Sequence, residues 1–579
     1  MRVLGIEGTA WCASAAIHDA ETDDVFIESD AYEPDSGGIH PREAAEHMAE
    51  TLPEVIDAAL SYAEDTAGAG GIDAVAFSRG PGLGPCLRTV GTAARAVAGT
   101  LDVPLVGVNH MVAHLEIGRH RSGFEDPICL NASGANAHVL GYHDGRYRVL
   151  GETMDTGVGN AIDKFTRHVG WTHPGGPKVE RAAADGEYVD LPYVVKGMDF
   201  SFSGIMSAAK DLYDEGVPVE DVCFSLQEHV FAMLTEVAER ALSLTGNDQL
   251  VLGGGVGQND RLREMLATMC AQRGVAFHAP EPRFLRDNAG MIAVLGARML
   301  AAGDTVPISE SAIDPNYRPD QVPVTWRGTT ASSAGSANAT EIAADTAETV
   351  PDAADAATDA AGAATDAATT AADASENVTT RAATDRGDAL DLRGAEAAVE
   401  IIDEATVRKR RRPKAYRHPT LDETLRRNRT TLEARLLNEA RRAGVPTPLV
   451  HDVDVANAEL MLQYVGTADL AERITPDRVR EVGAHLARLH RAGFVHGDPT
   501  TRNVRVGESA PTLIDFGLGY HTGHVEDHAM DLHILEQSIR GTATDPDPLV
   551  SAAESGYAAV GETNVLDRLR TIEGRGRYR

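Results

Sequence analysis

The chain has 579 residues, a formal net charge of -34 and a hydrophobic fraction of 43%. This length suffices for several packed domains, and the apolar fraction excludes a chain that is unfolded throughout. The acidic balance excludes nucleic-acid binding by bulk charge, so any such site has to be a local basic patch or has to be shared with a partner.

The basic and sulfur-containing residues give further bounds. Only six lysines occur among 53 basic residues. An acidic, lysine-poor surface predicts adaptation to a salty cytosol; an acidic-partner role and a merely acidic mesophile protein are the alternatives. Five scattered cysteines without paired spacing argue against a disulfide framework or a zinc knuckle. Because neither a signal peptide nor a membrane-length apolar run is found, we expect a cytoplasmic protein.

Residues 1–326 have the pattern of an α/β domain pair. Short apolar segments predict the strands Val3–Ile6, Ala13–Ile17, Asp73–Phe77, Leu105–Val108, Ile128–Ala132 and Leu250–Leu252. Longer amphipathic segments predict helices over Glu43–Ala63 and Asn259–Gln272. Residues 327–390 are rich in Ala, Asp and Thr and predict a disordered acidic linker, with a weak Ala-rich helix as the alternative. Residues 391–579 again have strand and helix patterns and form a third segment.

Three glycine-rich turns follow predicted strands in the first segment. They lie at Gly5–Thr9, Arg79–Gly84 and Gly253–Asn259. Such turns present backbone N–H groups that can hold a phosphate, and the last one opens a helix, whose N-terminus favours an anion. A plain hairpin turn is the alternative for the first. Two such turns far apart in the sequence suggest a nucleotide held between two lobes.

A histidine pair lies in the segment Val108–Glu116. His110 and His114 are four residues apart, which places them on one helical face at a distance suited to a shared metal ion. Structural histidines are the alternative. Asp287 could be a third ligand, although an Asp before a helix is otherwise an N-cap. Met111 stands where a zinc protease has its general base, which argues against proteolysis.

Residues 1–326 resemble the universal tRNA threonylcarbamoyladenosine synthase family, also known as O-sialoglycoprotein endopeptidase-like proteins. The resemblance rests on nine segments in family order, which are Gly5–Thr9, Arg79–Leu87, Val108–Glu116, Ala132–Asn136, Gly159–Lys164, His173–Glu180, Phe200–Ile205, Leu252–Asn259 and Arg286–Ile292. It implies the two-lobed fold of the actin-like, sugar-kinase-like ATPases. It also implies transfer of threonylcarbamoyl from threonylcarbamoyl-AMP to N6 of adenosine 37 of tRNA.

The resemblance also implies the site residues. His110, His114 and Asp287 would hold Fe²⁺ or Zn²⁺. The adenylate would be lined by residues from several turns, with Asp163 also a candidate catalytic residue: Asn131, Ala132, Ser133, Gly134, Ala135, Asp163, Gly176, Glu180 and Asn259. Solvated helix charges are the alternative for the acidic members. Asn131 stands where the family has a Tyr, so the fourth metal position is left to Asn131, water or substrate.

Two motifs in residues 391–579 predict phosphoryl transfer. Phe494–Asn503 contains Asp498, a candidate base, and Asn503, while Leu513–Gly517 contains Asp515. An Asp that orients the attacking group and an Asn and Asp that bind Mg²⁺ are what this chemistry needs.

This segment resembles the small RIO-like atypical kinase of the KEOPS complex, a small bilobal α+β protein-kinase-like domain. The resemblance implies that ATP and Mg²⁺ are bound by residues of the glycine turn, one lysine, one glutamate and the two motifs: Gly394, Ala395, Glu396, Ala397, Lys409, Glu433, Asn503 and Asp515. Glu439 is the alternative to Glu433. Because no Ala-Pro-Glu activation segment follows, ATPase or self-phosphorylating behaviour is expected. Pro499 and Arg502 depart from the family pattern.

The sequence therefore predicts a fused, bifunctional archaeal-type enzyme with tRNA, threonylcarbamoyl-AMP and two small KEOPS subunits, one dimerising and one binding the tRNA end, as partners. The basic segments Arg408–Arg412 and Arg575–Arg579 are candidates for contact with tRNA phosphate, and a solvated strand face is the alternative for the first. Two other functions stay open: a sugar-kinase-fold small-molecule phosphotransferase and a non-catalytic, ATP-gated tRNA scaffold.

Overall fold

The computed structural model describes residues 1–32, 40–67, 71–134, 136–143, 145–327, 392–393, 396–507 and 510–573. The described residues on either side of segment 328–391 belong to one compact unit. The predictions made for Ala135, Gly394, Ala395, the linker 327–390 beyond its first residue and the tail Arg575–Arg579 lie outside the described residues.

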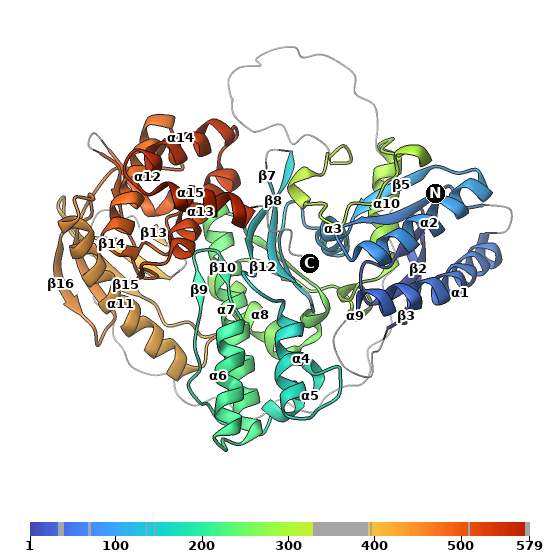
Figure 1. The fold of residues 1–579 in the computed structure, drawn as a ribbon, viewed down its shortest axis with the longest axis horizontal. Helices are drawn as coiled ribbons and strands as arrows, with labels where there is room; N and C mark the ends of the chain where they lie inside the picture. The colour runs from blue at the N-terminus through green and yellow to red at the C-terminus, as the bar shows by residue number, and fades with distance from the viewer. Residues whose placement is uncertain are drawn as a thin grey trace, which may run out of the picture. The chain divides into compact units, whose positions relative to one another are not determined.

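Residues 1–327 contain two five-stranded sheets (Figure 1), whose strand orders correspond when the second is read in reverse. The first sheet has the order β3-β2-β1-β4-β5 and contains β1 (Arg2–Glu7), β2 (Cys12–Asp19), β3 (Asp24–Ala31), β4 (Ala74–Gly80) and β5 (Leu105–Asn109). The second has the order β12-β11-β6-β7-β8 and contains β6 (Ile128–Ala132), β7 (Ala137–His143), β8 (Arg146–Glu152), β11 (Gln249–Gly253) and β12 (Ala276–His278). These bounds confirm the six predicted strands, with small shifts at their ends.

The pairing directions repeat as well. Strand β1 is antiparallel to β2 and parallel to β4, while β6 is antiparallel to β7 and parallel to β11. The central strands are buried along nearly their whole length, which explains their continuous apolar sequences. In each sheet, the turns after the parallel strands therefore meet at one edge, where ligands bind in open α/β sheets.

Helices cover the sheets. Those of the first sheet are α1 (Pro41–Ala67), α2 (Gly84–Leu101) and α10 (Ala289–Ala301), while α3 (His110–Ser122) contacts strands of both sheets. Those that accompany the second sheet are α4 (Val158–His168), α5 (Gly176–Ala183), α6 (Ser203–Asp214), α7 (Val219–Thr245), α8 (Asp260–Arg273) and the short α9 (Pro282–Leu285). The helices predicted at 43–63 and 259–272 correspond to α1 and α8, and Asn259 is the N-cap of α8 rather than its first residue.

Residues 392–573 contain a five-stranded antiparallel sheet of order β13-β14-β15-β17-β16. Its strands are β13 (Leu392–Arg393), β14 (Ala397–Ile401), β15 (Thr406–Arg411), β16 (Val450–Asp454) and β17 (Glu459–Gln463). The helices are α11 (Pro419–Arg442), α12 (Pro476–Arg491), α13 (Val525–Thr542), α14 (Asp547–Ala558) and α15 (Thr563–Glu573), and short strands β18 (Ala468–Asp469), β19 (Phe494–Val495), β20 (Val504–Val506), β21 (Thr512–Leu513) and β22 (Tyr520–His521) lie among them. This mixture of a sheet and a helical part is the α+β arrangement expected of the segment.

Helix α7 carries buried carboxylates that pair with residues of the C-terminal segment. Glu236 accepts from Arg417 Nη2 at 2.7 Å and from Arg429 Nη2 at 3.2 Å. One turn later, Glu239 accepts from Lys414 Nζ at 2.5 Å. All five side chains are buried. Since buried charges are stable only when paired, these contacts specify how α7 meets the C-terminal segment. None of the described helices combines the length and apolarity needed to cross a membrane.

Candidate metal and nucleotide sites

His110, His114 and Asp287 meet, as predicted, although 173 residues separate His114 from Asp287. Nε2 of His110 and Nε2 of His114 lie 3.4 Å and 3.2 Å from Asp287 Oδ1. Both histidines are in the first turns of α3, whose N-cap is Asn109. The N-cap of α10 is Asn288. The capping alternative for Asp287 is therefore wrong, and its carboxylate faces the imidazoles instead.

A second set of polar groups fixes the three side chains. Nδ1 of His110 is 3.2 Å from Glu7 Oε2, and Trp11 Nε1 donates to Asp287 Oδ2 at 3.1 Å. Glu7 is fully buried at the end of β1. A carboxylate that accepts from the outer nitrogen of a histidine orients the inner nitrogen toward a metal and raises its basicity. Glu7 thus belongs to the candidate site, although the sequence motifs did not single it out.

The charges of the cluster shift its titration. Burial alone would lower the pKa of His110, but the carboxylates of Glu7 and Asp287 outweigh it and raise this pKa to about 10. Burial favours the neutral form of Asp287, yet the two imidazoles hold its pKa below the usual range. Burial lowers the pKa of His114. An imidazole between the buried carboxylate of Glu7 and the partly buried carboxylate of Asp287 lies in surroundings that stabilise a cation.

The donor set fits a transition-metal ion. Two imidazole nitrogens and one carboxylate oxygen are ligands typical of Zn²⁺ and Fe²⁺. Oδ1 of Asn131 is buried without a hydrogen bond to any described residue. A Cβ added to Gly253 would lie 3.3 Å from this oxygen and 3.6 Å from His114 Cβ, so the glycine turn and Asn131 lie next to the cluster. An unpartnered buried acceptor beside three ligands is consistent with a bound cation.

Three helix N-termini bring the predicted adenylate residues together. Helix α4 begins after Gly157 and α5 after Gly175, and neither N-cap has a side-chain hydrogen bond. Ser133 and Gly134, which follow β6, accept from the backbone N–H groups of Gly159 and Asn160 at the start of α4. The N–H groups of Gly159 and Asn160 are therefore already paired, whereas α5 begins without a side-chain cap, and the partial positive charge of such a helix start suits an anion.

The remaining predicted adenylate residues lie at these helix starts or contact them. Asp163 on α4 accepts from the backbone N of Gly175 at 2.8 Å. Glu180 on α5 accepts from the backbone N of Asp260 at 3.0 Å, and Asn259 caps α8. These contacts hold α4, α5 and α8 to one another. Gly176 begins α5, and a Cβ added there would meet nothing within 4 Å. Ala132 ends β6, beside the glycine turn.

In the C-terminal segment, the predicted ATP-binding residues line one cavity of about 310 Å³. The cavity wall includes the predicted residues Glu396, Ala397, Lys409, Glu433, Asp498, Asn503 and Asp515. Lys409 Nζ lies 2.7 Å from Glu433 Oε1 and 2.9 Å from Asp515 Oδ1. The Lys–Glu pair on strand and helix is the arrangement that holds ATP phosphates in kinases. Glu439 pairs with His521 instead, at 2.7 Å, which excludes it as the lysine's partner.

Asp498 and its neighbours have the contacts of a catalytic loop. Asn503 Nδ2 donates to Asp498 Oδ2 at 2.9 Å. Burial raises the pKa of Asp498 to about 7 even though Arg240 of α7 lies beside it. Asp531 on α13 accepts from the backbone N–H groups of His496 and Gly497 at 2.9 and 2.8 Å. It positions the loop, a role that the sequence motifs did not reveal.

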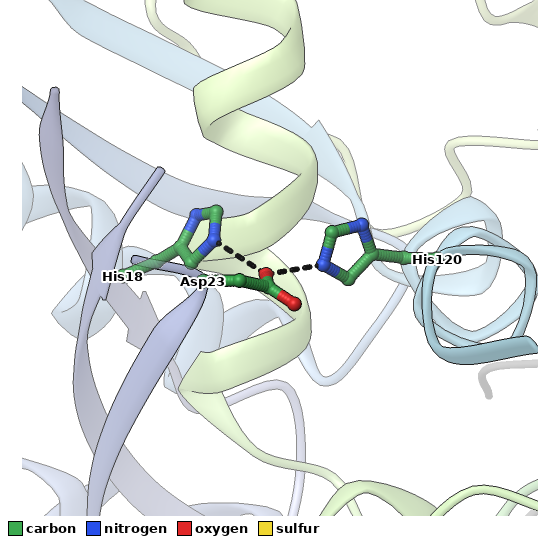
Figure 2. A group of neighbouring side chains, drawn as sticks. All are labelled: His18, Asp23 and His120. Carbon is green, nitrogen blue, oxygen red and sulfur yellow. Dashed lines mark hydrogen bonds and ion pairs between the residues drawn. The ribbon is translucent and has the colours of Figure 1, made fainter. Parts of the chain in front are cut away.

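A second histidine–aspartate group lies away from these sites. Figure 2 shows His18 and His120 approaching Asp23 from two sides; their Nε2 atoms are 3.3 Å and 2.6 Å from Asp23 Oδ1. Arg298 Nη2 lies 2.7 Å from Nδ1 of His120, so this nitrogen accepts and Nε2 carries the hydrogen that Asp23 accepts. A metal would have to displace that hydrogen. The group is therefore an ion-pair and hydrogen-bond cluster that ties the β2–β3 turn to α3.

The basic run Arg408–Arg412 is largely neutralised by its own neighbours. Arg408 and Arg410 pair with Glu459, and Arg411 with Glu396 and Glu433. Lys409 and Arg411 are buried, so only part of this run forms the solvated strand face of the alternative, and the acidic neighbours reduce the charge that the run could offer to tRNA phosphate.

Comparison with known proteins assigns the chain. Residues 22–294 match the family model of the tRNA N6-adenosine threonylcarbamoyltransferase. The bifunctional tRNA threonylcarbamoyladenosine biosynthesis protein of Halobacterium salinarum is 64% identical over 100% of this chain and 99% of its own length. That of Methanospirillum hungatei is 47% identical over 100% and 99%. Among solved structures, full-length HypF covers 52% of this chain at 13% identity and a TM-score of 0.37, too low to carry an argument. The predicted adaptation to salt fits the halobacterial relatives, and the chain belongs to the family of bifunctional tRNA threonylcarbamoyladenosine biosynthesis proteins.

Proposed function

We propose that residues 1–327 transfer threonylcarbamoyl from threonylcarbamoyl-AMP to N6 of adenosine 37 of tRNA, in the cytoplasm, in an actin-like ATPase fold. The repeated strand order of the two sheets supports this fold. The observation that carries the function is the approach of the His110 and His114 imidazoles to within 3.4 Å of Asp287, a donor set that suits an Fe²⁺ or Zn²⁺ ion.

The residues divide the work of the reaction. The metal, when bound, supplies a Lewis acid that polarises the carbamoyl carbonyl or orients the threonyl group. The N-terminus of α5 holds the adenylate phosphate. The exocyclic N6 is a weak nucleophile, so its placement against the carbonyl matters most. The new bond joins N6 to the carbamoyl carbon, the bond between that carbon and the phosphate oxygen breaks, and the proton that N6 loses leaves with the released AMP.

Reconstitution tests the transferase. The full chain, with the two small KEOPS subunits, receives tRNA and threonylcarbamoyl-AMP, and the nucleosides are measured by mass spectrometry. We expect modified adenosine with the wild type and with His120→Ala, and almost none with His110→Ala. His120 is a matched control because it lies on the same helix α3, outside the cluster. Metal analysis of the same samples identifies the ion, and full activity of His110→Ala would refute the assignment.

The C-terminal segment is proposed to bind ATP and Mg²⁺ and to act as a kinase or ATPase that regulates the complex. The support is the convergence of Lys409, Glu433 and Asp515 within 2.9 Å in one cavity. Asp515→Asn should abolish ATP turnover, while Asp547→Asn, a change at an exposed helix start, should not. Phosphorylated sugar as a product would favour the phosphotransferase alternative. Binding of tRNA with neither modified adenosine nor dependence of ATP turnover on Asp498 would favour the scaffold.

A further inference from the structure

The ATP cavity is not lined by the C-terminal segment alone. Helix α7 of the N-terminal segment contributes Arg240, Ser243 and Leu244 to the same wall that holds Lys409, Asp498 and Asn503. A helix from the transferase part of the chain therefore faces the groups that handle ATP phosphates. The question is what this helix places there.

Two contacts dock the end of α7 onto the catalytic loop. Arg240 Nη1 lies 2.8 Å from Asp498 Oδ2. The carbonyl oxygen of Leu244 accepts from Arg502 Nε, also at 2.8 Å. Residues three and four apart share one face of a helix. Ser243 follows Arg240 by three positions and precedes Leu244, so it lies on the face of α7 that meets residues 498–502.

The hydroxyl of Ser243 is available. Ser243 is half-buried, and its hydroxyl has no hydrogen-bond partner among the residues that the structure describes. Thr245, two residues on, is exposed and donates to the carbonyl oxygen of Ala241 at 2.8 Å. The other hydroxyl groups of the cavity wall, those of Tyr464 and Thr500, belong to the C-terminal segment itself. Ser243 is thus an unengaged alcohol that another part of the chain brings to the ATP site.

We propose that Ser243 is a phosphate acceptor for the ATP site of its own chain. This inference rests on the proposed binding of ATP in that cavity. Oγ of Ser243 forms a bond to the γ-phosphorus, Asp498 accepts its proton, and the bond between the γ-phosphorus and the β–γ bridging oxygen breaks to release ADP. The transfer requires the ion pair between Arg240 and Asp498 to open. A buried carboxyl that titrates near neutrality is suited to take the proton.

The surroundings also fit the product. A phosphoserine carries about two negative charges and strong acceptor oxygens, which arginines bind well. Arg240 and Arg502 both line the cavity. Arg240 is one helical turn before Ser243, and Arg502 donates to the carbonyl oxygen of Leu244, the residue after Ser243. The phosphate would therefore stay in the cavity and occupy the place of the next ATP. Self-modification of this kind would limit further ATP turnover.

Phosphopeptide mapping tests the inference. The full-length wild type, Ser243→Ala, Thr245→Ala and Asp515→Asn are incubated with ATP and Mg²⁺, and ADP is measured in parallel. Trypsin cleavage after Arg240 and Arg261 releases the peptide 241–261, in which the hydroxyl residues are Ser243 and Thr245. We expect phosphate on this peptide in the wild type and in Thr245→Ala, and its loss in Ser243→Ala and Asp515→Asn.

The outcomes separate the two proposals. ADP formation without phosphate on Ser243 overturns this inference and leaves the ATP site standing. Absence of both ADP and phosphate overturns the inference together with the proposed function of the cavity. Wild-type enzyme added to Asp515→Asn should not label the variant, because the transfer is within one chain. Labelling of that variant at a rate that rises with enzyme concentration would contradict the intramolecular step.

Discussion

Removing the charge of Glu7 should weaken the metal site without removing a ligand. Glu7→Gln keeps the size of the side chain but takes away the carboxylate 3.2 Å from His110 Nδ1. Two unit charges at that distance interact by about 5 kcal/mol at an effective dielectric constant of about 20, which sets an upper bound. Changes to such outer groups commonly lower metal affinity by about tenfold to hundredfold, or roughly 1.4–2.7 kcal/mol. We expect a loss in that range.

The assay is a competition titration of Zn²⁺ between the protein and a chromophoric chelator. Glu28→Gln is the matched control, because Glu28 is an exposed carboxylate on β3 of the same sheet. The nucleoside assay should show a parallel fall in modified adenosine at limiting metal. If Glu7→Gln binds Zn²⁺ as tightly as the wild type while it remains folded, then Glu7 does not support His110, and the reasoning about the second set of polar groups fails.

Three further predictions concern the C-terminal segment. Glu433→Gln should lower ATP affinity by at least about tenfold in a binding titration, since breaking a buried ion pair costs about 2–5 kcal/mol. Glu439→Gln should leave the ATP affinity unchanged, and equal losses in the two variants would contradict the assignment of Glu433 as the partner of Lys409. Asp531→Asn should reduce ATP turnover more than ATP binding, because an amide offers one acceptor atom for the two backbone N–H groups of the loop; unchanged turnover would exclude the positioning role. Burial and, to a smaller extent, the charge of Arg488 lower the pKa of His485 to about 4 in the folded chain. As the pH falls below about 6.5, His485 therefore takes up a proton in the unfolded chain before it does so in the folded chain. The stability of this segment should then fall by about 2 kcal/mol between pH 7 and 5 from His485 alone. Urea midpoints should show this loss in the wild type and in the exposed-site control His451→Gln, but not in His485→Gln. An equal loss in all three proteins would contradict the role of His485.

The sequence predicted those parts of the sites that local spacing encodes. His110 and His114 are one helical turn apart, and Asp498, Asn503 and Asp515 lie in two short motifs, so their meeting needed little tertiary information. Glu7 was not identified because a single Glu at the end of an apolar strand has no spacing that points to a histidine 103 residues away.

Other contacts depend on how distant elements pack. Nothing in the helical pattern of α7 indicates that Arg240 and Ser243 line a cavity whose other walls begin with Glu396, more than 150 residues further along the chain. The cluster of His18, Asp23 and His120 likewise follows from the packing of the β2–β3 turn against α3. Spacing alone names the residues of a site when they share one element. Asp287, 173 residues from His114, was predicted through the family resemblance, and α7 at the ATP cavity had neither signal.

The charged groups of α7 bear on how the two segments stay joined in concentrated salt. At about 1 M ionic strength the Debye length is about 3 Å, so attractions between groups in contact with solvent are almost extinguished. Glu236, Arg417 and Arg429 are at most 6% exposed, which keeps dissolved ions away from them. The surrounding protein therefore keeps salt from screening the attraction between these charges. An interface between the two segments that is made by buried ion pairs should keep its stability across a wide range of salt concentration, whereas an interface made by surface pairs would become less stable as the salt concentration rises.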